Sequence, residues 1–189
     1  MTTDVHPWAA DLADMYAQIW TRLVRGVHDR RAATRHPTLA TVAPDGLPQA
    51  RTVVLRAAEP VAASIDIHTD IRSAKVAALT VNPHAVVHVW DPSAHLQIRL
   101  EAVAEILSGD DVAGIWARVP DASRQSYGAT PATGRQIPDA LAYVRHGDPV
   151  SFAVVRLRVQ AIDALHLGPQ HRRARYERTT HWAGQWLVP

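Results

Sequence analysis

The N-terminal part of the chain carries apolar side chains at the spacing of a helix. Between residues 7 and 31 they recur every three or four positions, and the stripe consists of Leu12, Tyr16, Ile19, Trp20, Leu23 and Val27. That spacing puts apolar side chains on one face of an α-helix. Pro7 suits a first helical turn, where the N–H group that proline lacks has no partner within the helix. The pattern predicts an amphipathic helix over residues 7–31.

Beyond residue 35 the helical period gives way to alternating runs rich in Val, Ile, Leu and Thr, which are typical of strands. Asp45-Gly46 separates the first two runs, and this pair tolerates the positive φ angles of a tight hairpin turn. We expect strands over residues 38–44, 47–57, 61–69, 84–90, 95–107 and 151–162, and a last hairpin over residues 176–188.

Two short helices are predicted between these strands. The first covers residues 71–82, with Thr69 or Asp70 as its capping residue, and ends near Asn82-Pro83 because a residue before proline disfavours helical backbone. The second follows Ser108–Asp111, which fits a capping box, and ends near Val119. Residues 120–149 are rich in Pro, Gly, Thr and Asp, and predict a long ordered loop with a helical turn.

The predicted strands follow one another through short turns, without the alternation of strands and helices that builds a parallel sheet. An antiparallel sheet of this kind closes most simply into a small barrel. We therefore expect a mainly β fold with flanking helices, built as a six- to seven-stranded antiparallel barrel. A single domain covers residues 1–189, with the N-terminal helix in residues 1–34 and the barrel in residues 35–189.

Composition removes several classes of protein from consideration. The chain has 189 residues, of which 47% are hydrophobic and 20% charged, as in one globular domain. It has no cysteine, which excludes disulfides, thiolate metal sites and a cysteine nucleophile. The net charge of +2 does not indicate a nucleic-acid or membrane partner, and no apolar run is long enough to cross a bilayer. Acids stand at the N-terminus where a signal peptide carries bases, so we expect a cytoplasmic protein.

Two segments predict an anion-binding site. In the first, residues 51–56, Arg51 and Arg56 point to opposite faces of a strand. A guanidinium group can grip a phosphate through two parallel hydrogen bonds. The alternative is that both arginines lie at a sheet edge with their charged groups in water.

The second segment joins a strand to a helix. His68 and Thr69 end the strand, and Ser73 and Lys75 fall in the first turns of the helix, where free N–H groups and the helix dipole favour anions. The alternative is that Thr69 only caps the helix and Lys75 is solvated. We favour the anion site because both segments come from strands that we expect to neighbour each other.

The remaining polar candidates are weaker. Gln97 lies on the polar face of an alternating strand, where its amide could bind the edge of a heterocycle or simply face water. The histidines lack the spacing of a metal site, and we expect no metal. The basic run over residues 171–178 is either a solvated face or a patch for a polyanion. We expect Trp182, Trp186 and Leu187 in the core.

Four segments in this order resemble the pyridoxamine 5′-phosphate oxidase-like family of FMN-binding split barrels. The resemblance spans residues 35–189 and rests on RTVVLR (51–56), HTDIRSAK (68–75) with ALTVNP (78–83), LQIRLEAVAEIL (96–107) and HWAGQWLVP (181–189). It implies a homodimer with FMN bound at the subunit interface. Each segment alone is a weak signal, and the ordered set is more specific.

The resemblance also implies roles for individual residues. Arg51 and Lys75 would hold the FMN phosphate, with Thr69 and Ser73 beside them. The other implied cofactor contacts are the backbone of Thr52, Val53 and Val54 along the isoalloxazine ring, His68 in place of a family tyrosine, and Gln97 from the partner subunit.

The chain departs from the family at its substrate motif, Arg-Leu-His-Asp-Arg. Only Arg172 matches; Ala174 takes the place of the histidine and Tyr176 that of the second arginine. Arg56 replaces a lysine that meets the substrate phosphate. The chain is in this respect more similar to the oxidase-related branch of the family. We expect an anionic small-molecule substrate held by Arg56 and Arg172, and no catalytic side chain stands out.

Three functions are compatible with these residues. The first is an FMN-dependent oxidoreductase, for which the cofactor supplies the chemistry. The second is the same fold holding F420 or haem, with the basic run over residues 171–178 available for the anionic tail of F420. The third is a flavin-binding or sensor protein without turnover, which the incomplete substrate motif allows.

Overall fold

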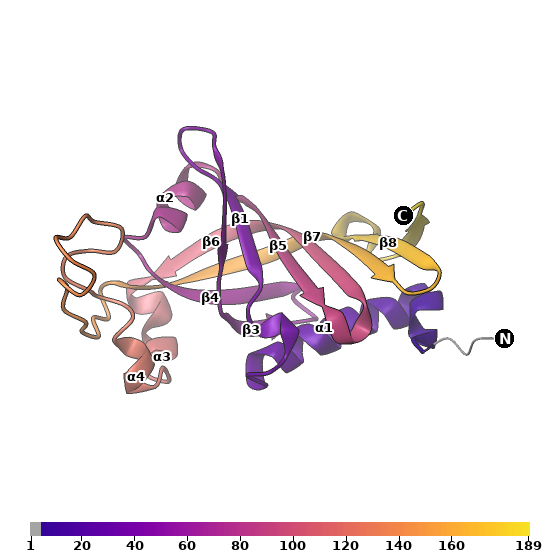
Figure 1. The fold of residues 1–189 in the computed structure, drawn as a ribbon, viewed down its shortest axis with the longest axis horizontal. Coiled ribbons are helices and arrows are strands. Elements are labelled where there is room, and N and C mark those ends of the chain that lie inside the picture. Colours follow the sequence, from indigo (N-terminus) through magenta and orange to yellow (C-terminus); the bar gives the residue numbers. More distant parts are fainter. Residues whose placement is uncertain (1–4) are drawn as a thin grey trace.

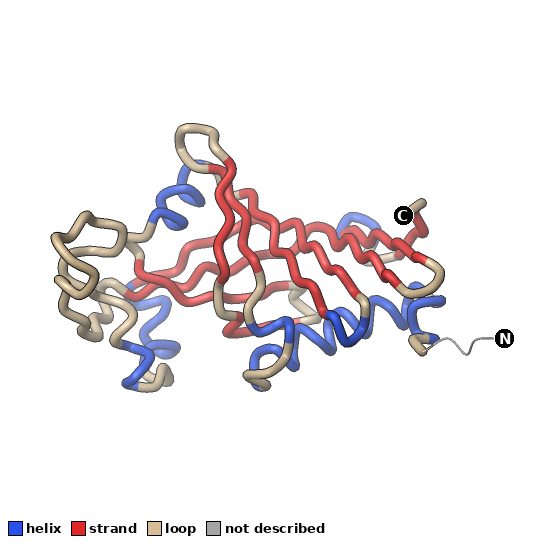
Figure 2. Tube along the Cα trace, viewed as in Figure 1, coloured by secondary structure: helices blue, strands red, loops and turns tan. Residues whose placement is uncertain are grey.

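The computed structural model describes residues 5–189 as a curved antiparallel sheet with helices along its sides (Figures 1 and 2). The strands are β1 (Thr38–Val42), β2 (Pro48–Thr52), β3 (Leu55–Glu59), β4 (Ser64–Asp70), β5 (His84–Asp91), β6 (Leu96–Ser108), β7 (Phe152–Leu167), β8 (His171–Glu177) and β9 (Gly184–Leu187). The α-helices are α1 (Leu12–His28), α2 (Ala74–Val81), α3 (Ala113–Trp116) and α4 (Asp121–Arg124). The 3₁₀ helices are η1 (Pro7–Ala10), η2 (Ala33–Arg35), η3 (Pro92–Ala94), η4 (Gly109–Val112) and η5 (Arg178–Thr180).

The helix predicted over residues 7–31 is divided into η1 and α1. The break falls at Asp11, whose backbone is extended (φ −121°, ψ 137°) and whose carboxylate accepts a hydrogen bond from the Asp14 N–H at 2.9 Å. Asp11 is thus the N-cap of α1. The predicted apolar stripe is confirmed, since Ile19, Trp20 and Leu23 are buried and its other members, Leu12, Tyr16 and Val27, pack against the core. No helix among residues 5–189 is long and apolar enough to cross a membrane.

The sheet closes on itself because its two edges are joined by a very short link. The strand order is β2-β1-β5-β6-β7-β4-β3, with β8 and β9 continuing from β7. β2 and β3 therefore lie at opposite edges of this order, yet only Val53 and Val54 separate them in the chain. Two residues span less than about 11 Å, so the edges must meet and the sheet is rolled into a barrel. The expected mainly β antiparallel barrel is confirmed, with nine strands instead of six to seven.

Two predictions about the strands need correction. The strand predicted over residues 47–57 is wrong as one element, because the chain crosses from one sheet edge to the other at Val53, whose N–H donates to the Pro37 carbonyl at 2.9 Å. The expectation that the strands of Arg51 and Thr69 are neighbours is also wrong. β2 and β4 do not pair, and the closure of the barrel is what brings their ends together.

Both predicted helix caps are also wrong. α2 begins at Ala74 with Ser73 as its N-cap, and the Ser73 side chain makes no capping hydrogen bond. Ser108 precedes η4 and likewise makes no such bond, so the capping box does not form. The Thr69 side chain turns to Ser73 and Lys75 instead, with Oγ1 3.1 Å and 2.8 Å from their side-chain atoms.

The long connection between β6 and β7 covers one end of the sheet, at the left of Figure 1. It contains η4, α3, α4 and the loop predicted over residues 120–149, which is confirmed with α4 as its helical turn. A second apolar cluster lies beneath it, built around Tyr127 and Phe152, whose ring centroids are 5.1 Å apart. At the other end Trp182 packs on Tyr16 as expected, whereas Trp186 is 46% exposed and its expected place in the core is wrong.

Candidate functional site

Arg51 and Lys75 line one cavity at the end of the barrel next to α2. The cavity has a volume of about 490 Å³ and is lined by Arg51, Arg72, Ser73, Ala74, Lys75, Thr133, Gly134 and Arg135. Arg51 lies opposite the buried Leu39 in the antiparallel pair of β1 and β2, so its side chain points to the inner face of the sheet. The two predicted halves of the anion site therefore come together.

The Arg51 guanidinium is held by its neighbours on β1 and β2. Its Nη1 donates to Thr41 Oγ1 at 2.7 Å and to the Leu39 carbonyl at 3.2 Å, and its Nη2 donates to Gln49 Oε1 at 2.8 Å. Burial lowers the pKa of Arg51 from its ordinary value. None of these partners carries a charge, so the cation is fixed in place without being neutralised.

Lys75 is anchored in the same way by hydroxyl groups. Its Nζ donates to Thr69 Oγ1 at 2.8 Å, and Thr69 Oγ1 lies 3.1 Å from Ser73 Oγ. Thr69 and Ser73 are only 3% and 6% exposed. Burial lowers the pKa of Lys75, and the positive charge of Arg51 lowers it further, against the weaker opposing effect of Asp70. Two cations are thus held close together with no anion between them.

The cavity wall contains no carboxylate. The nearest, Asp70, is occupied elsewhere: its oxygens accept from Arg72 Nε at 2.9 Å, from Arg72 Nη2 at 2.6 Å and from the Gly128 N–H at 3.1 Å. That ion pair neutralises Arg72 and leaves the charges of Arg51 and Lys75. A cationic cavity without a carboxylate, with hydroxyl groups beside its lysine, is suited to a phosphate group.

Arg56 and His68 line a different cavity, of about 410 Å³, between the sheet and α3. Successive residues of a strand point to opposite faces, so His68 faces this cavity while Thr69 faces the first. Its lining also includes Arg118 and the ion pair of Asp66 with Arg156, whose two hydrogen bonds are 3.0 and 2.9 Å long. His68 is therefore not beside the Arg51 and Lys75 side chains.

The second cavity has its own electrostatic character. Burial, with a further contribution from the charge of Arg56, lowers the pKa of His68 to about 4, so the imidazole is neutral at physiological pH. Arg56 Nε is buried and has no hydrogen-bond partner among residues 5–189. A buried donor without a partner is costly, and a ligand with an acceptor group would satisfy it.

Gln97 and Arg172 lie away from both cavities within one chain. Gln97 is on the outer face of β6, with Oε1 3.4 Å from His88 Nε2. Arg172 is on β8, at the opposite end of the sheet from α2 in Figure 1. The neighbouring arginines of the basic run form ion pairs instead of a free patch: Arg173 with Asp163 at 2.8 Å and Arg175 with Glu101 at 3.0 Å.

Residues 174 and 176, where the family substrate motif has its histidine and second arginine, face the core. Ala174 is fully buried, and Tyr176 is 1% exposed and donates a hydrogen bond to the Leu12 carbonyl at 2.8 Å. They share this side of β8 because side chains alternate along a strand. Tyr176 therefore holds α1 against the sheet, and Ala174 fills a place in the core.

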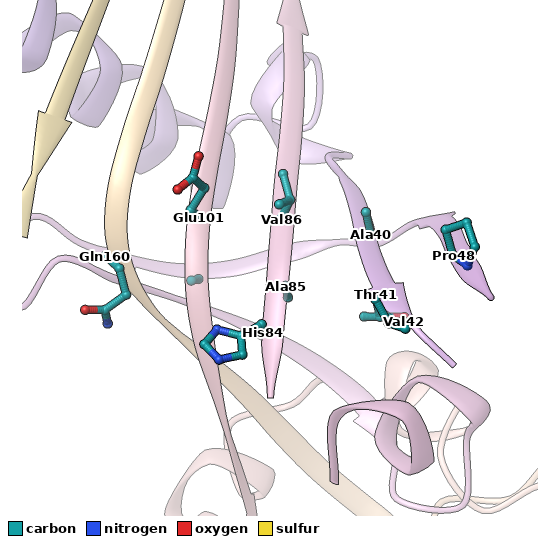
Figure 3. Close-up of a pocket in the computed structure, with 10 residues that line it drawn as sticks. Ala40, Thr41, Val42, Pro48, His84, Ala85, Val86, Glu101 and Gln160 are labelled. Atoms are coloured by element: carbon teal, nitrogen blue, oxygen red, sulfur yellow. The ribbon is translucent and has the colours of Figure 1, made fainter. Parts of the chain in front are cut away.

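The outer face of the sheet carries a shallow apolar hollow (Figure 3). It has a volume of about 500 Å³ and is lined mainly by small apolar side chains of β1, β5 and β6. Glu101, His84 and Gln160 stand at its side in Figure 3. Val42, which lines the hollow, is 37% exposed, and Trp90, elsewhere on β5, is 43% exposed.

Sequence reasoning missed Arg72 and the segment Thr133–Arg135 of the first cavity. Arg72 lies within the motif that pointed to the site, but nothing in the pattern showed that it would pair with Asp70. Thr133–Arg135 lies 58 residues or more beyond Lys75, in a loop without periodicity. Only the path of that loop in space brings it to the cavity.

Comparisons with known proteins agree with this architecture. Residues 13–108 match the family model described as "Pyridoxamine 5'-phosphate oxidase, FMN-binding domain". The pyridoxine/pyridoxamine 5'-phosphate oxidase of Microcystis aeruginosa is 33% identical over 99 residues, which are 52% of this chain and 45% of that protein. The enzyme of the same name from Thermosynechococcus vestitus is 29% identical over 152 residues, 80% and 62% of the two chains. The matches thus span about half to three-fifths of these relatives.

Two solved structures share the fold over nearly the whole chain. A pyridoxamine 5'-phosphate oxidase-related, FMN binding protein from Nostoc punctiforme has a TM-score of 0.72 and 25% identity, covering 99% of this chain and 100% of that one. PhzG from Burkholderia lata has a TM-score of 0.71 and 20% identity, covering 98% of both chains, and supports the fold alone. With the family model matching more than half of its residues, this chain belongs to the pyridoxamine 5'-phosphate oxidase family of FMN-binding split-barrel proteins.

Proposed function

We propose that this chain binds FMN and acts as a flavin-dependent oxidoreductase on an anionic small molecule. The observation that carries the proposal is the cavity in which Arg51 and Lys75 stand without a carboxylate, beside the buried hydroxyl groups of Thr69 and Ser73. This donor set fits a phosphate monoester, which carries about −1.5 to −2 charges at neutral pH and accepts several hydrogen bonds. The residues present therefore fit the phosphate end of FMN.

The chain's own residues have distinct roles in this proposal. Arg51 and Lys75 bind the phosphate, and Thr69 and Ser73 orient the ammonium group of Lys75. Arg56, with its unpartnered Nε, binds an acidic group of the substrate in the second cavity, where His68 is neutral and adds no charge. FMN, when bound, supplies the hydride acceptor.

The substrate proposed here is not pyridoxamine or pyridoxine phosphate. The support is the burial of Ala174 and Tyr176, which turns both substrate-motif positions of β8 toward the core. Arg172 shares their side of the strand, so its proposed contact with a substrate depends on the arrangement of subunits. Arg56 is the better supported anchor for the anionic group.

A homodimer is part of the same proposal. The outer sheet face carries an apolar hollow and exposed apolar side chains such as Val42 and Trp90, which a second copy would bury. Gln97 lies on this face, where it could reach a cofactor held by the other copy. An isologous pairing is the commonest solution for such a face. Sedimentation of the full chain tests it, with Val86→Arg expected to yield monomers.

The first experiment is the visible absorption spectrum of the purified chain, followed by mass analysis of the released chromophore. A flavin spectrum with the mass of FMN supports the proposal. F420 or haem would assign the same scaffold to another cofactor, and a colourless protein that also fails to bind added FMN would refute it. Photoreduction followed by reoxidation with candidate acceptors then separates an oxidoreductase from a protein that only holds flavin.

A further inference from the structure

We propose that Arg135 is a further ligand of the cofactor phosphate, and that the segment Thr133–Arg135 forms the outer wall of that site. The inference rests on the proposed FMN function and adds a residue from a distant loop to it. Arg135 lies 60 residues after Lys75 in the chain, yet both side chains line the same cavity.

The loop that carries Arg135 is tied to the strand that carries Thr69. The Gly128 N–H donates to Asp70 Oδ2 at 3.1 Å, and Arg72 Nη2 donates to the Ala129 carbonyl at 3.2 Å. Farther along, Thr130 and Val144 pair through two backbone hydrogen bonds of 3.0 and 2.8 Å, which close the base of the loop. Contacts with the end of β4 therefore fix the base of the loop and, with it, the position of the loop over the cavity.

The charges of the cavity show why a further cation matters there. Its four cations are Arg51, Arg72, Lys75 and Arg135, and its lining contains no acid. Asp70 neutralises Arg72, which leaves three positive charges around one space. Within residues 5–189, Arg135 has no ion-pair partner, and its side chain is exposed at the mouth of the cavity. Such an arrangement is unfavourable until an anion enters.

The hydrogen-bond donors point to the same conclusion. Arg51 already directs Nη1 and Nη2 to Thr41, Leu39 and Gln49, and Lys75 directs one donor to Thr69. Arg135 offers an uncommitted guanidinium fork, whose geometry matches two oxygens of a phosphate. Arg51 and Lys75 thus form the fixed floor of the site, and Arg135 supplies the bidentate contact from above.

The test is a comparison of FMN and riboflavin binding, measured by quenching of flavin fluorescence on the full chain. Arg135→Ala is expected to weaken FMN binding about tenfold, as for the loss of a charged hydrogen bond, and to leave riboflavin binding within about twofold of the wild type. The matched control is Arg145→Ala, because Arg145 is an exposed arginine of the same loop that does not line the cavity. It should bind both flavins as the wild type does.

Inorganic phosphate provides a second readout that needs no flavin. It is expected to raise the melting temperature of the wild type and of Arg145→Ala more than that of Arg135→Ala. Equal FMN affinity in Arg135→Ala and the wild type, or an equal loss of riboflavin binding, overturns the role of Arg135 and leaves the FMN proposal standing. A wild type that binds no FMN overturns the proposed function, and the phosphate response then decides the role of Arg135 by itself.

Discussion

The Nζ atom of Lys75 lies 2.8 Å from Oγ1 of Thr69, so a hydroxyl group at the end of β4 anchors the ammonium group of α2. Lys75 is the only lysine of the chain, which has 19 arginines. An ammonium group is a compact charge that fits beside a fixed guanidinium such as Arg51. This pair is the part of the molecule on which the proposed cofactor site depends most directly.

The first prediction concerns FMN affinity. Arg51→Met and Lys75→Met each remove one charge while keeping most of the apolar side chain. Each is expected to weaken FMN binding by about 1.5–3 kcal/mol, the range for a lost hydrogen bond to a charged group. Fluorescence titration measures the change, and riboflavin serves as the ligand without a phosphate. Unchanged FMN affinity in both variants would show that the FMN phosphate does not bind in this cavity.

The second prediction concerns the reactivity of Lys75. Because burial and Arg51 lower its pKa, more of its amine is neutral at a given pH than in an ordinary lysine. We expect acetylation of Lys75 to begin at lower pH than acetylation of a lysine in an unstructured peptide. Peptide mapping by mass spectrometry measures it and separates Lys75 from the N-terminal amine.

The same experiment has a charge-removal control. Arg51→Met takes away the neighbouring cation and should move the reaction of Lys75 back toward higher pH. Added phosphate should do the same, because an anion favours the ammonium form. A pH profile that is identical in the wild type and Arg51→Met would show that the two charges do not interact.

The third prediction follows from the neutral His68. Its pKa is about 4 in the folded chain against an ordinary 6.5, so between these values the unfolded chain binds a proton that the folded chain does not. Stability is then expected to rise with pH across this window, and to fall as the pH drops from about 6.5 toward 4. The slope from this one group is at most about 1.4 kcal/mol per pH unit.

Urea unfolding at several pH values tests this account. His68→Gln keeps a polar side chain that does not titrate, so the difference in stability between pH 7 and pH 5 should shrink relative to the wild type. The exposed His146 provides the control, since His146→Gln replaces a histidine outside the cavity. A pH dependence that His68→Gln leaves intact must come from other groups.

The sequence predicted the elements that local pattern determines. The apolar stripe of α1 and most of the strands rest on spacing within a few residues. The meeting of Arg51 with Lys75 was predicted from strands expected to be neighbours, and the closure of the barrel brings it about instead. The pattern did not predict the break at Val53-Val54, because a run of β-branched residues looks the same whether or not it crosses between sheet edges. It did not predict that Thr69 would bond Lys75 instead of capping α2, since both arrangements satisfy one hydroxyl group.

Long-range contacts account for the remaining misses. Arg135 reaches the cavity only because the 128–150 loop is fixed to Asp70, and no local pattern records that contact. Likewise Arg173 and Arg175 looked like a basic patch because their partners, Asp163 and Glu101, lie on other strands. Ion pairs between strands cannot be predicted from the sequence until the register of the strands is known.

The fourth prediction reverses an ordinary rule of helix stability. Alanine normally stabilises a helix interior by about 1 kcal/mol relative to glycine. Gly26 of α1, however, faces Thr34, and a Cβ atom there would come within 2.9 Å of the Thr34 backbone carbon. Gly26→Ala is therefore expected to destabilise the fold by about 1–3 kcal/mol, as overpacking does.

Gly114 of α3 is the matched control for this substitution. A Cβ atom at Gly114 meets only Arg118 Nη1, at 3.9 Å, so Gly114→Ala should be neutral or slightly stabilising. Denaturant unfolding of both variants measures the contrast. If the two substitutions shift the denaturant midpoint equally, the close approach of α1 to Thr34 does not determine the cost of placing alanine at position 26.

The last prediction tests whether the family substrate motif could be restored on β8. Ala174→His with Tyr176→Arg restores the histidine and the second arginine of the motif, but both positions are buried in the core, and Tyr176 donates to the Leu12 carbonyl. A histidine and an arginine among the apolar side chains of the core are unfavourable, so the double variant is expected to lose several kcal/mol of stability. It should gain no activity on pyridoxamine phosphate. The milder Tyr176→Phe removes only the hydrogen bond, at about 1 kcal/mol, and reports whether the hydroxyl contributes to holding α1 in place. A stable double variant that oxidises pyridoxamine phosphate would show that β8 can turn these side chains toward a substrate, and would refute the structural role given to them here.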